Sequence, residues 1–555
     1  MTKPLYLARL VGTQEQMGAQ HGRLTAGDAV KLVEFYRTMP ERALAGSGGA
    51  ASRFVVRQIA TAWQARLARE RPVEFAARTR AFIDAVVAER PDCERRTARL
   101  ALATMDTMQN CVSLAARAQL GPFTPALAMR AAASAIPACA TVIAWGRTTG
   151  DGELLFARNF DFPGLGVWDE APAFVACVAD SGQCYGFFTT RGADVPVVTV
   201  VNEAGLVIAP HTRWHRGVTW GGAIIVDLVH EIARRAETLD DAIRIARSRP
   251  ASSSWGLAIG SARERSGIVV ELAGNHVEVV LPTPGAEHLV CTNRYRNAAM
   301  QAGEFAASSA WAHHSDHREH RLRTLVERRA APLVPRDLAR MLGDRFDSGR
   351  RRRFGSIVAQ ATNVHAVVIA PAARSAWVGT DRAPCNEGRW AELAWTWDGP
   401  AGGWEIGAEL SSGFRARELV DFVAPHDAAT RHVHDGVRAY EHEHDAAAAR
   451  ASIERAVAAD PDDPSLRLAA AWLAHETAAP DRAVIHIHAG LAVETDPYRR
   501  GQLLTCGVRA AEDPALAKRW LDELSRMQGD AFDELRARAR RRGPMQANLT
   551  MCDAY

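Results

Sequence analysis

The alternation of apolar and polar residues divides the 555-residue chain into three parts. Residues 1–138 carry apolar side chains every three or four positions, in stretches such as AGDAVKLVEFYRTM and PVEFAARTRAFIDAVVAERP, which is typical of amphipathic helices. From Ala140 onward, short apolar runs are separated by Gly, Asp and Asn turns, which predicts strands. Beyond about Ala424 the pattern is helical again and rich in alanine.

The middle part, residues 139–424, combines both kinds of element. Helices are predicted at 222–236, at 239–248 and over about 316–345. Strands, then helices, then strands predict an α+β fold built from layers of sheets and helices. The predicted strands are TVIAWG, ELLFARNF, AFVACVAD, CYGFFTT, VPVVTVV, GLVIAP, WGLAIGSA, SGIVVELAG, HVEVVLP, VHAVVIAP, SAWVGT and AELAWTWD.

The C-terminal part, residues 425–555, contains a weak internal repeat. AVAADPDDPSLRLAAAWLA and GLAVETDPYRRGQLLTCGV resemble two copies of one unit, with Asp-Pro pairs that begin at Asp460 and Asp496, 36 residues apart. This spacing is close to the period of a tetratricopeptide-like helical hairpin. We therefore expect a helical-repeat region that could bind a protein partner, with a non-repetitive helical cap as the alternative.

Composition and charge argue against several classes of protein. The chain is 47% hydrophobic and 24% charged, which is ordinary for a globular protein, and its net charge of +3 favours neither nucleic acid nor an anionic membrane as a partner. The start MTKPLYLARLVGTQEQMG lacks the apolar core of a signal peptide, and the longest apolar run, Ala131 to Gly146, is broken by Pro137 and is too short to span a bilayer. The nine cysteines include no CxxC pair. We expect a soluble protein in a reducing, cytoplasmic setting.

One stretch, AIPACATVIAWGRTTGDGELLFARNFDF at 135–162, carries candidate chemistry. The turn TTGDGE supplies the positive-φ positions of a tight hairpin. If the chain folds back near residue 150, Cys139 lies opposite Asp161 with Arg158 close by, although the register could slip by two or three residues. A cation near a thiol favours the reactive thiolate. The ordinary alternative is that Cys139 is a small buried hydrophobic residue.

The order of these residues resembles the isopenicillin-N acyltransferase-like (acyl-coenzyme A:6-aminopenicillanate acyltransferase) family of N-terminal nucleophile (Ntn) hydrolases, with choloylglycine hydrolases as more distant relatives. In that family a nucleophilic Cys, a strand, a Gly turn, a second strand and R-x-x-D follow one another. Here they are Cys139, TVIAWG, Asp151-Gly152, ELLFA and RNFD at 158–161. The resemblance extends over about residues 8 to 420 through GTQEQMGAQHG, VVNEAGLVIAPHT, GIVVELAGNHVEVV, HLVCTNRY and HSDHREHRL.

The resemblance implies a four-layer αββα Ntn-hydrolase sandwich and self-cleavage between Ala138 and Cys139. Residues 1–138 would then be a helical pro-segment that becomes a small chain, and 139–424 the catalytic domain. The freed α-amine, with an ordinary pKa of ~7.7–8.0, would act as the base for its own thiol. The thiol would attack a linear amide and form a thioester acyl-enzyme. The implied substrate is a small-molecule acyl amide, with acyl-coenzyme A as an alternative donor, and no cofactor is implied.

The same resemblance assigns roles to individual residues. Cys139 would be nucleophile and base, and Arg158 and Asp161 would hold the amine and tune the thiol. Asn293, in the Thr292-Asn293 pair, would either donate to the oxyanion or hold the α-amine in place.

The chain departs from the choloylglycine hydrolases at one position. Their oxyanion Asn is replaced here by Thr212, beside His211, although a hydroxyl could still donate. Thr212, His211 and Arg318, which lies in the segment HSDHREHRL, are therefore further candidates for an oxyanion or pocket role. Two alternatives stay open: a catalytically silent Ntn-like scaffold whose helical repeats bind a partner, and an unprocessed thiol hydrolase with His211 as base.

A histidine-rich segment, AHHSDHREH, contains His313, His314, His317 and His320. Such spacing can place imidazoles on one face of a helix and bind a metal ion. The sequence offers no His-Glu-x-x-His motif and no clear carboxylate or cysteine partner nearby. We therefore expect no metal site.

Overall fold

The computed structural model divides the chain into two compact units. It describes residues 4–44, 50–118, 138–217, 219–306, 308–405, 413–419, 421–541, 547–549 and 553–554. The first unit comprises 1–307, 322–342 and 363–424, and the second comprises 308–321, 343–362 and 425–555. Segments 308–321 and 343–362 fall within the predicted catalytic range 139–424 but group with the C-terminal helices.

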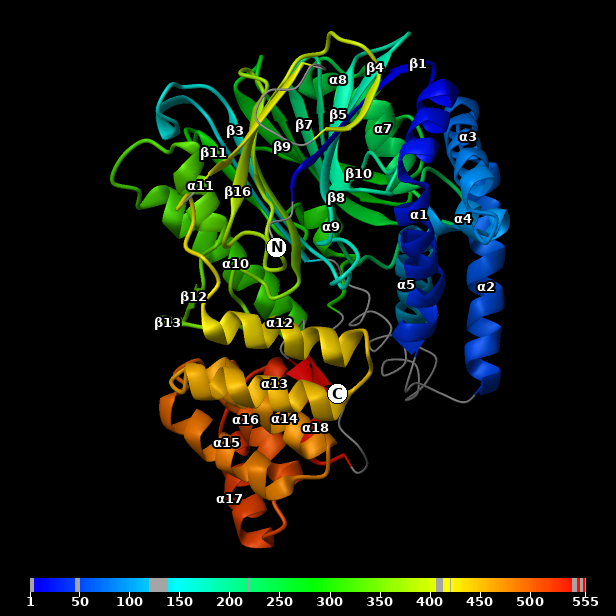
Figure 1. Cartoon of the computed structure of the whole chain (residues 1–555). Coiled ribbons are helices and arrows are strands. Elements are labelled where there is room, and N and C mark those ends of the chain that lie inside the picture. Colours follow the sequence, from blue (N-terminus) through cyan, green and yellow to red (C-terminus); the bar gives the residue numbers. More distant parts are fainter. Residues whose placement is uncertain are drawn as a thin grey trace. The chain divides into compact units, whose positions relative to one another are not determined.

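Two sheets form the centre of the first unit, and Figure 1 shows their strands. The strand order is β10-β9-β8-β7-β6-β5-β4-β1-β17 in one sheet and β11-β2-β3-β14-β15-β16-β18 in the other. The first sheet consists of β1 (Tyr6–Gly12), β4 (Pro172–Ala179), β5 (Tyr185–Thr190), β6 (Thr199–Asn202), β7 (Leu206–Thr212), β8 (Ser254–Ser261), β9 (Ser266–Ala273), β10 (His276–Val280) and β17 (Gly402–Glu405). The second consists of β2 (Ala138–Ala144), β3 (Leu155–Asp161), β11 (His288–Cys291), β14 (Asn363–Ala370), β15 (Ser375–Gly379), β16 (Trp390–Trp395) and β18 (Phe414–Leu419).

Every strand predicted from the sequence is present, and so are the helices predicted near 222–236, 239–248 and 316–345. One part of the prediction is wrong: YLARLVG at Tyr6–Gly12 lies in the segment read as helical but forms β1, parallel to β4 and antiparallel to β17. A short apolar run of this kind fits a buried strand and a buried helix equally well. The N-terminal part of the chain is therefore built into the first sheet.

The two sheets share a core. Buried side chains of the first sheet, including Phe174 and Val207, pack with Ile143, Phe156 and Val367 of the second. Successive side chains of a strand point to opposite faces, so the odd-numbered residues of β2 face this core. The opposite face of the first sheet packs on helices through a second cluster that includes Val175, Ile208, Trp63 and Val229. The helices of the first unit are α1 (Gln14–Leu44), α2 (Ala50–Arg69), α3 (Val73–Glu89), α4 (Arg95–Ala101), α5 (Thr104–Ala118), α7 (Ile225–Arg235), α8 (Leu239–Arg247), α9 (Ala298–Gln301) and α11 (Pro335–Leu342), with a 3-10 turn at Gly146–Thr148.

The N-terminal helices α1 and α3 pack closely on each other (Figure 1). A Cβ atom at Gly18 would lie 2.2 Å from the carbonyl oxygen of Arg78, and one at Gly22 would lie 2.4 Å from that of Phe82. Glycine at both positions lets the two helix backbones approach. This contact explains the two glycines of the motif GAQHG at 18–22.

The second unit is mainly helical. The helices α12 and α13, α14 and α15, and α16 and α17 pack as neighbours. The unit contains the first part of α10 (Ser309–Glu327), together with α12 (Ala428–Glu441), α13 (Ala446–Ala459), α14 (Pro464–Glu476), α15 (Pro480–Val493), α16 (Pro497–Ala510), α17 (Pro514–Ser525) and α18 (Asp530–Ala539), and the short pairs β12 (Phe346–Asp347) with β13 (Arg350–Arg351) and β19 (Ala547–Asn548) with β20 (Asp553–Ala554).

The Asp-Pro pairs of the second unit lie at helix ends. Asp460 follows the end of α13, whereas Asp463 caps α14 and is followed by Pro464. Asp496 caps α16 in the same way and is followed by Pro497. Proline is favoured in the first helical turn because its missing N–H is not needed there. Asp463 and Asp496 therefore occupy the same position at the starts of α14 and α16, whereas Asp460 lies at the end of α13.

Among the described residues, no helix is long and apolar enough to cross a membrane. The eight cysteines in this part of the chain are all without a disulfide.

Candidate active site

The candidate nucleophile lies near the start of the central strand of a three-strand group. β2 lies between β11 and β3, and its register pairs Cys139 with Phe160 and Ala138 with Asp161. The predicted pairing of Cys139 with Asp161 is therefore wrong by one residue. Residues 119–137, which lead into this strand, lie outside the described residues.

The one-residue difference changes which side chains share a face with Cys139. Because side chains alternate along a strand, a shift by one position moves a side chain to the other face of the sheet. Arg158 pairs with Thr141 and shares the face of Cys139, whereas Asp161 lies on the opposite face. The Asp161 Oδ1 atom accepts a hydrogen bond from Asn363 Nδ2 at 2.9 Å. Asp161 thus lies beside the backbone of Ala138 rather than beside the thiol.

The Cys139 thiol is buried next to a guanidinium group. Arg158 Nη2 lies 3.3 Å from Cys139 Sγ and also donates to the carbonyl oxygen of Pro210 at 2.5 Å. Arg158 Nη1 donates to Thr199 Oγ1 at 3.3 Å, so the guanidinium is held from both ends. A buried positive charge at this distance stabilises the thiolate over the thiol.

The amide nitrogen of Cys139 also has a specific partner. Its N–H donates to Asn293 Oδ1 at 3.0 Å, and Asn293 Nδ2 donates to the carbonyl oxygen of Thr212 at 3.1 Å. β11 pairs Cys291 with Thr141, so Asn293 continues that register to the level of Cys139. Asn293 is predicted either to donate to the oxyanion or to hold the α-amine. This contact corresponds to the second role, since it is made with the nitrogen of Cys139.

The three further candidates lie in different surroundings. Thr212, at the end of β7, has a buried hydroxyl that makes no hydrogen bond with any residue that the structure describes. His211 Nε2 lies 2.9 Å from the hydroxyl of Thr141, two residues along β2 from the candidate nucleophile. Arg318 belongs to the second unit, where its Nε atom donates to the carbonyl oxygen of His314 at 3.2 Å.

Cys139, Arg158 and Thr212 line one wall of a largely apolar pocket. Other walls are formed by α1, α3 and the residues after α4, with side chains such as Leu32 and Ile83. About 1090 Å³ of the pocket is free of atoms, counting the part open to solvent. A large apolar pocket with a few convergent polar groups is the usual form of a small-molecule site.

Comparison with known protein families gives a match to part of the chain. The family model described as "AAT: Acyl-coenzyme A:6-aminopenicillanic acid acyl-transferase" matches residues 147–383. The predicted resemblance to this acyltransferase family is confirmed. The match covers less than half of the chain; Arg158 and Asn293 lie within it, and Cys139 lies before it.

The chain also has a partial likeness to a solved structure. The Caenorhabditis elegans N-acylethanolamine-hydrolyzing acid amidase (NAAA) ortholog is similar with a TM-score of 0.30 and 14% sequence identity, over 42% of this chain and 93% of that chain. No curated protein matches the chain.

One residue of the pocket wall, Asp194, belongs to a buried ion-pair network. Asp194 lines the pocket and accepts hydrogen bonds from Arg78 Nη2 at 2.6 Å and Nε at 2.9 Å, and its Oδ1 lies 2.9 Å from His21 Nδ1. Burial alone would raise the pKa of Asp194, but Arg78 and His21 hold it below its usual range. Arg78 and His21 come from the N-terminal helices. Sequence reasoning did not identify Asp194, because nothing in RGADVPVV marks it.

His365 is a second residue that the sequence did not indicate. It pairs with Phe160 across β14 and β3, so Cys139, Phe160 and His365 form a row across three strands. Burial, with the positive charge of Arg158 adding to it, lowers the pKa of His365 to about 3. The imidazole is therefore neutral near pH 7.

This histidine should make stability fall in acid. The unfolded chain protonates His365 from about pH 6.5 downward, whereas the native chain does so only near pH 3. The free energy of unfolding should therefore fall as the pH drops through this window, by up to ~1.4 kcal/mol per pH unit for this one group. Urea unfolding of the wild type and of His365→Gln at several pH values measures the difference. In His365→Gln the free energy of unfolding should depend less steeply on pH, by the uptake of about one proton. Equal pH dependence in both proteins would contradict the lowered pKa of His365.

Proposed function

We propose that the chain is a self-processing Ntn-type cysteine amidohydrolase or acyltransferase that acts on a linear amide through a thioester acyl-enzyme. The observation that carries the proposal is the surroundings of Cys139: its thiol lies 3.3 Å from Arg158 Nη2, its nitrogen lies 3.0 Å from Asn293 Oδ1, and it lines the apolar pocket. The acyltransferase family match over 147–383 supports the class of chemistry.

Self-cleavage is the first step of the proposed mechanism. The thiolate of Cys139 attacks the carbonyl carbon of Ala138 and the C–N bond between the two residues breaks. The nitrogen keeps one proton from its amide and takes up the proton lost by the thiol, which produces the α-amine of Cys139 and a thioester to Ala138. Water then hydrolyses the thioester, releasing the carboxylate of Ala138 and restoring the thiol. Asn293 Oδ1 holds the nitrogen throughout.

The acyl-transfer cycle uses the same atoms. The neutral α-amine takes the thiol proton, and the thiolate attacks the carbonyl of a bound amide. The leaving amine takes this proton as the C–N bond breaks, so that the thioester forms. Water or a second amine then attacks the thioester with the α-amine as general base. In this proposal Arg158 stabilises the thiolate, while Asp161 acts on the backbone at 138–139 from the other face of the sheet.

The pocket suggests the substrate class. Its walls near the thiol are apolar, and the N-terminal helices provide side chains such as Leu32, Ile83 and Met105. An apolar acyl group would be buried there with its carbonyl at Cys139. The acyl group could come from a small-molecule amide or from acyl-coenzyme A.

The arrangement of the chain follows from the same proposal. We assign residues 1–138 to a small chain, 139–424 to a catalytic domain with the four-layer αββα Ntn architecture, and 425–555 to a tetratricopeptide-like region that could bind a protein partner. The layering is supported by the shared core of the two sheets and by α7, α8 and α11 packed on strands. The repeat is supported by the Asp-Pro helix starts at Asp463 and Asp496. A reducing cytoplasm would keep the Cys139 thiol free.

The intact mass of the purified protein and a series of amides test the proposal together. We expect fragments 1–138 and 139–555, and hydrolysis of N-acyl amides that becomes faster from acetyl toward longer acyl chains. An uncut chain that is inert toward the whole series and toward acyl-coenzyme A would favour a silent scaffold. An uncut chain that hydrolyses amides would favour a side-chain base such as His211.

Thr212 is expected to provide an oxyanion donor. Its hydroxyl is buried, lines the pocket and makes no hydrogen bond within the described part of the chain. Thr212→Val keeps the shape and removes the donor, so kcat should fall ~10²–10³-fold with little change in KM. Thr212→Ser should recover most of the rate. Steady-state kinetics on fully cleaved protein measure this, and a kcat within a few-fold of wild type for Thr212→Val would remove the residue from the mechanism.

A further inference from the structure

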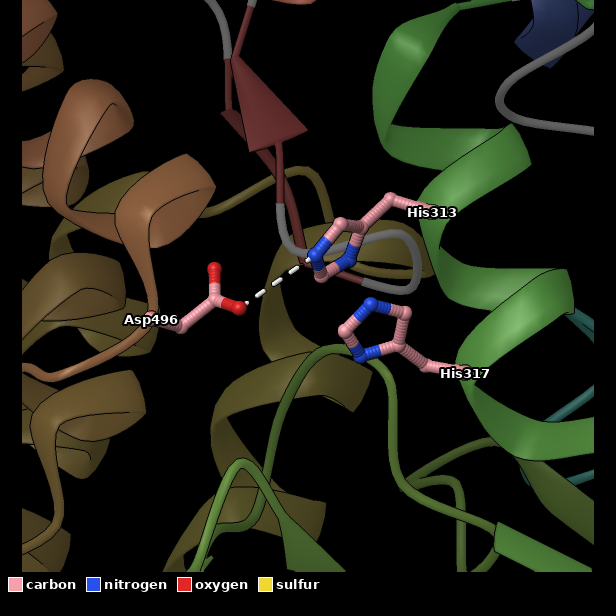
Figure 2. Close-up of side chains that lie close together, drawn as sticks. All are labelled: His313, His317 and Asp496. Carbon is pink, nitrogen blue, oxygen red and sulfur yellow. Dashed lines mark ion pairs between the residues drawn. The ribbon is translucent and has the colours of Figure 1, made fainter. Parts of the chain in front are cut away.

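The second unit brings together side chains that the sequence keeps far apart. Figure 2 shows His313 and His317 on successive turns of α10, with Asp496 facing them from the start of α16. One ligand-type atom from each of the three residues lies within 4.8 Å of the others. We propose that His313, His317 and Asp496 bind one divalent transition-metal cation of the zinc type.

The two histidines have the geometry of a helix-borne chelate. Residues four apart lie on the same helix face, and the two imidazole rings are stacked with centroids 3.8 Å apart and an interplanar angle of 29°. One nitrogen of each ring lies within 4.8 Å of the other and of an Asp496 oxygen. Imidazole is a preferred ligand of zinc and related cations.

The carboxylate lies at a ligand-to-ligand distance. His313 Nε2 and Asp496 Oδ2 are 3.4 Å apart, longer than a normal N–H···O hydrogen bond. Two ligands of a tetrahedral zinc ion with bonds of ~2.0–2.1 Å lie about 3.3 Å apart. Asp496 is also held in place: its Oδ1 accepts from the backbone N–H of Arg499 at 2.8 Å, and its Oδ2 accepts from the hydroxyl of Ser348 at 3.2 Å.

The outer nitrogens of both histidines are already engaged. His317 Nδ1 lies 3.0 Å from Asp347 Oδ1, and His313 Nδ1 lies 2.8 Å from Ser356 Oγ. Histidines that bind metals almost always donate their second ring N–H to a carboxylate or another oxygen, which leaves the first nitrogen with its lone pair. Here that leaves Nε2 of each ring for the cation.

The local charge balance suits a cation. Three carboxylates, those of Asp347, Asp496 and Glu494, lie near two guanidinium groups, those of Arg352 and Arg499. Arg352 is paired with Glu494 at 2.5 and 2.6 Å, and Arg499 Nη2 donates to Ser356. The His317 side chain is 37% exposed, so a fourth coordination position is open to water. The bound cation would link α10, the β12 region and α16.

Zinc titration of the full chain tests the proposal. Protein treated with a chelator and dialysed is titrated with Zn²⁺ by calorimetry, and the metal content is counted by native mass spectrometry. The wild type should bind one more Zn²⁺ than His317→Ala, and removing this ligand should weaken the site by at least ~100-fold. Asp347→Asn should weaken it by ~10–100-fold. His320→Ala, on the same helix at an exposed position, is the matched control and should bind like the wild type.

Two further readouts separate metal binding from misfolding. Without metal, the wild type and His317→Ala should melt at similar temperatures, and Zn²⁺ should raise the melting temperature of the wild type only. Co²⁺ should give visible d–d absorption in the wild type that is absent in His317→Ala. If both proteins bind Zn²⁺ with equal stoichiometry and affinity, or if neither responds to it, His313 and Asp496 form an ion pair without a metal site and the proposal is wrong.

Discussion

Cys139→Ala should leave the chain as one uncut polypeptide and reduce amide hydrolysis to background. The thiol is the proposed nucleophile both for the Ala138–Cys139 bond and for the substrate, and an alanine side chain offers no atom that can form the thioester. Intact mass measures the first effect, where the wild type should give 1–138 and 139–555. Hydrolysis of an N-acyl amide measures the second.

Cys291→Ala is the matched control for this substitution. Cys291 lies on the neighbouring strand β11, is buried, and has Arg213 Nη2 at 3.3 Å from its Sγ, the same distance as between Arg158 and Cys139. Unlike Cys139, it is not among the described residues that line the pocket. This variant should be cut and active like the wild type. Equal loss in both variants would mean that removing a buried thiol disturbs the fold, and full activity in Cys139→Ala would exclude the proposed nucleophile.

The strands could be predicted because their signal is local. TVIAWG and ELLFARNF carry the β-branched and aromatic residues that favour strands, and β2 and β3 form where predicted. The register could not be predicted, because the connection between these strands is longer than a tight hairpin. It contains a 3-10 turn at Gly146–Thr148 before the glycine turn, and this shifts the pairing by one residue. Arg158 is on the thiol's face as a result, and Asp161 is not.

Contacts between distant segments had no signal in the sequence. The carboxylate partner of His313 is Asp496, which is far away in the chain. The Asp496 Oδ1 atom caps α16, while its Oδ2 atom faces the imidazole. Asp194 and His365 could not be predicted for the same reason. Their partners lie on strands and helices that are distant in the sequence and that only the fold brings close. The thiol and its guanidinium were found because both belong to one hairpin.

Asp194→Ala should detach the N-terminal helices from the rest of the first unit. The Asp194 carboxylate is the anionic partner of Arg78, and the Arg78 guanidinium also donates to Tyr185 and Gln14. All of these side chains are buried. Removing one partner of a buried pair leaves an uncompensated charge and typically costs 3–5 kcal/mol, or ~4 kcal/mol here. Urea unfolding of the first unit should show this loss in the uncut Cys139→Ala background as well.

In cleaved protein the same change should appear as loss of a fragment. After cleavage, 1–138 is held by β1 in the first sheet and by side-chain contacts, so it should co-elute with 139–555 in size-exclusion chromatography of the wild type. With Asp194→Ala a large part of it should elute separately. Asp28→Ala is the control, since Asp28 and Arg191 also pair across the two fragments but are partly exposed, and such pairs are worth about 1 kcal/mol or less. The prediction is wrong if Asp194→Ala has the same free energy of unfolding and the same elution profile as Asp28→Ala. The buried Arg78–Asp194 pair would then not be what holds the N-terminal helices in place.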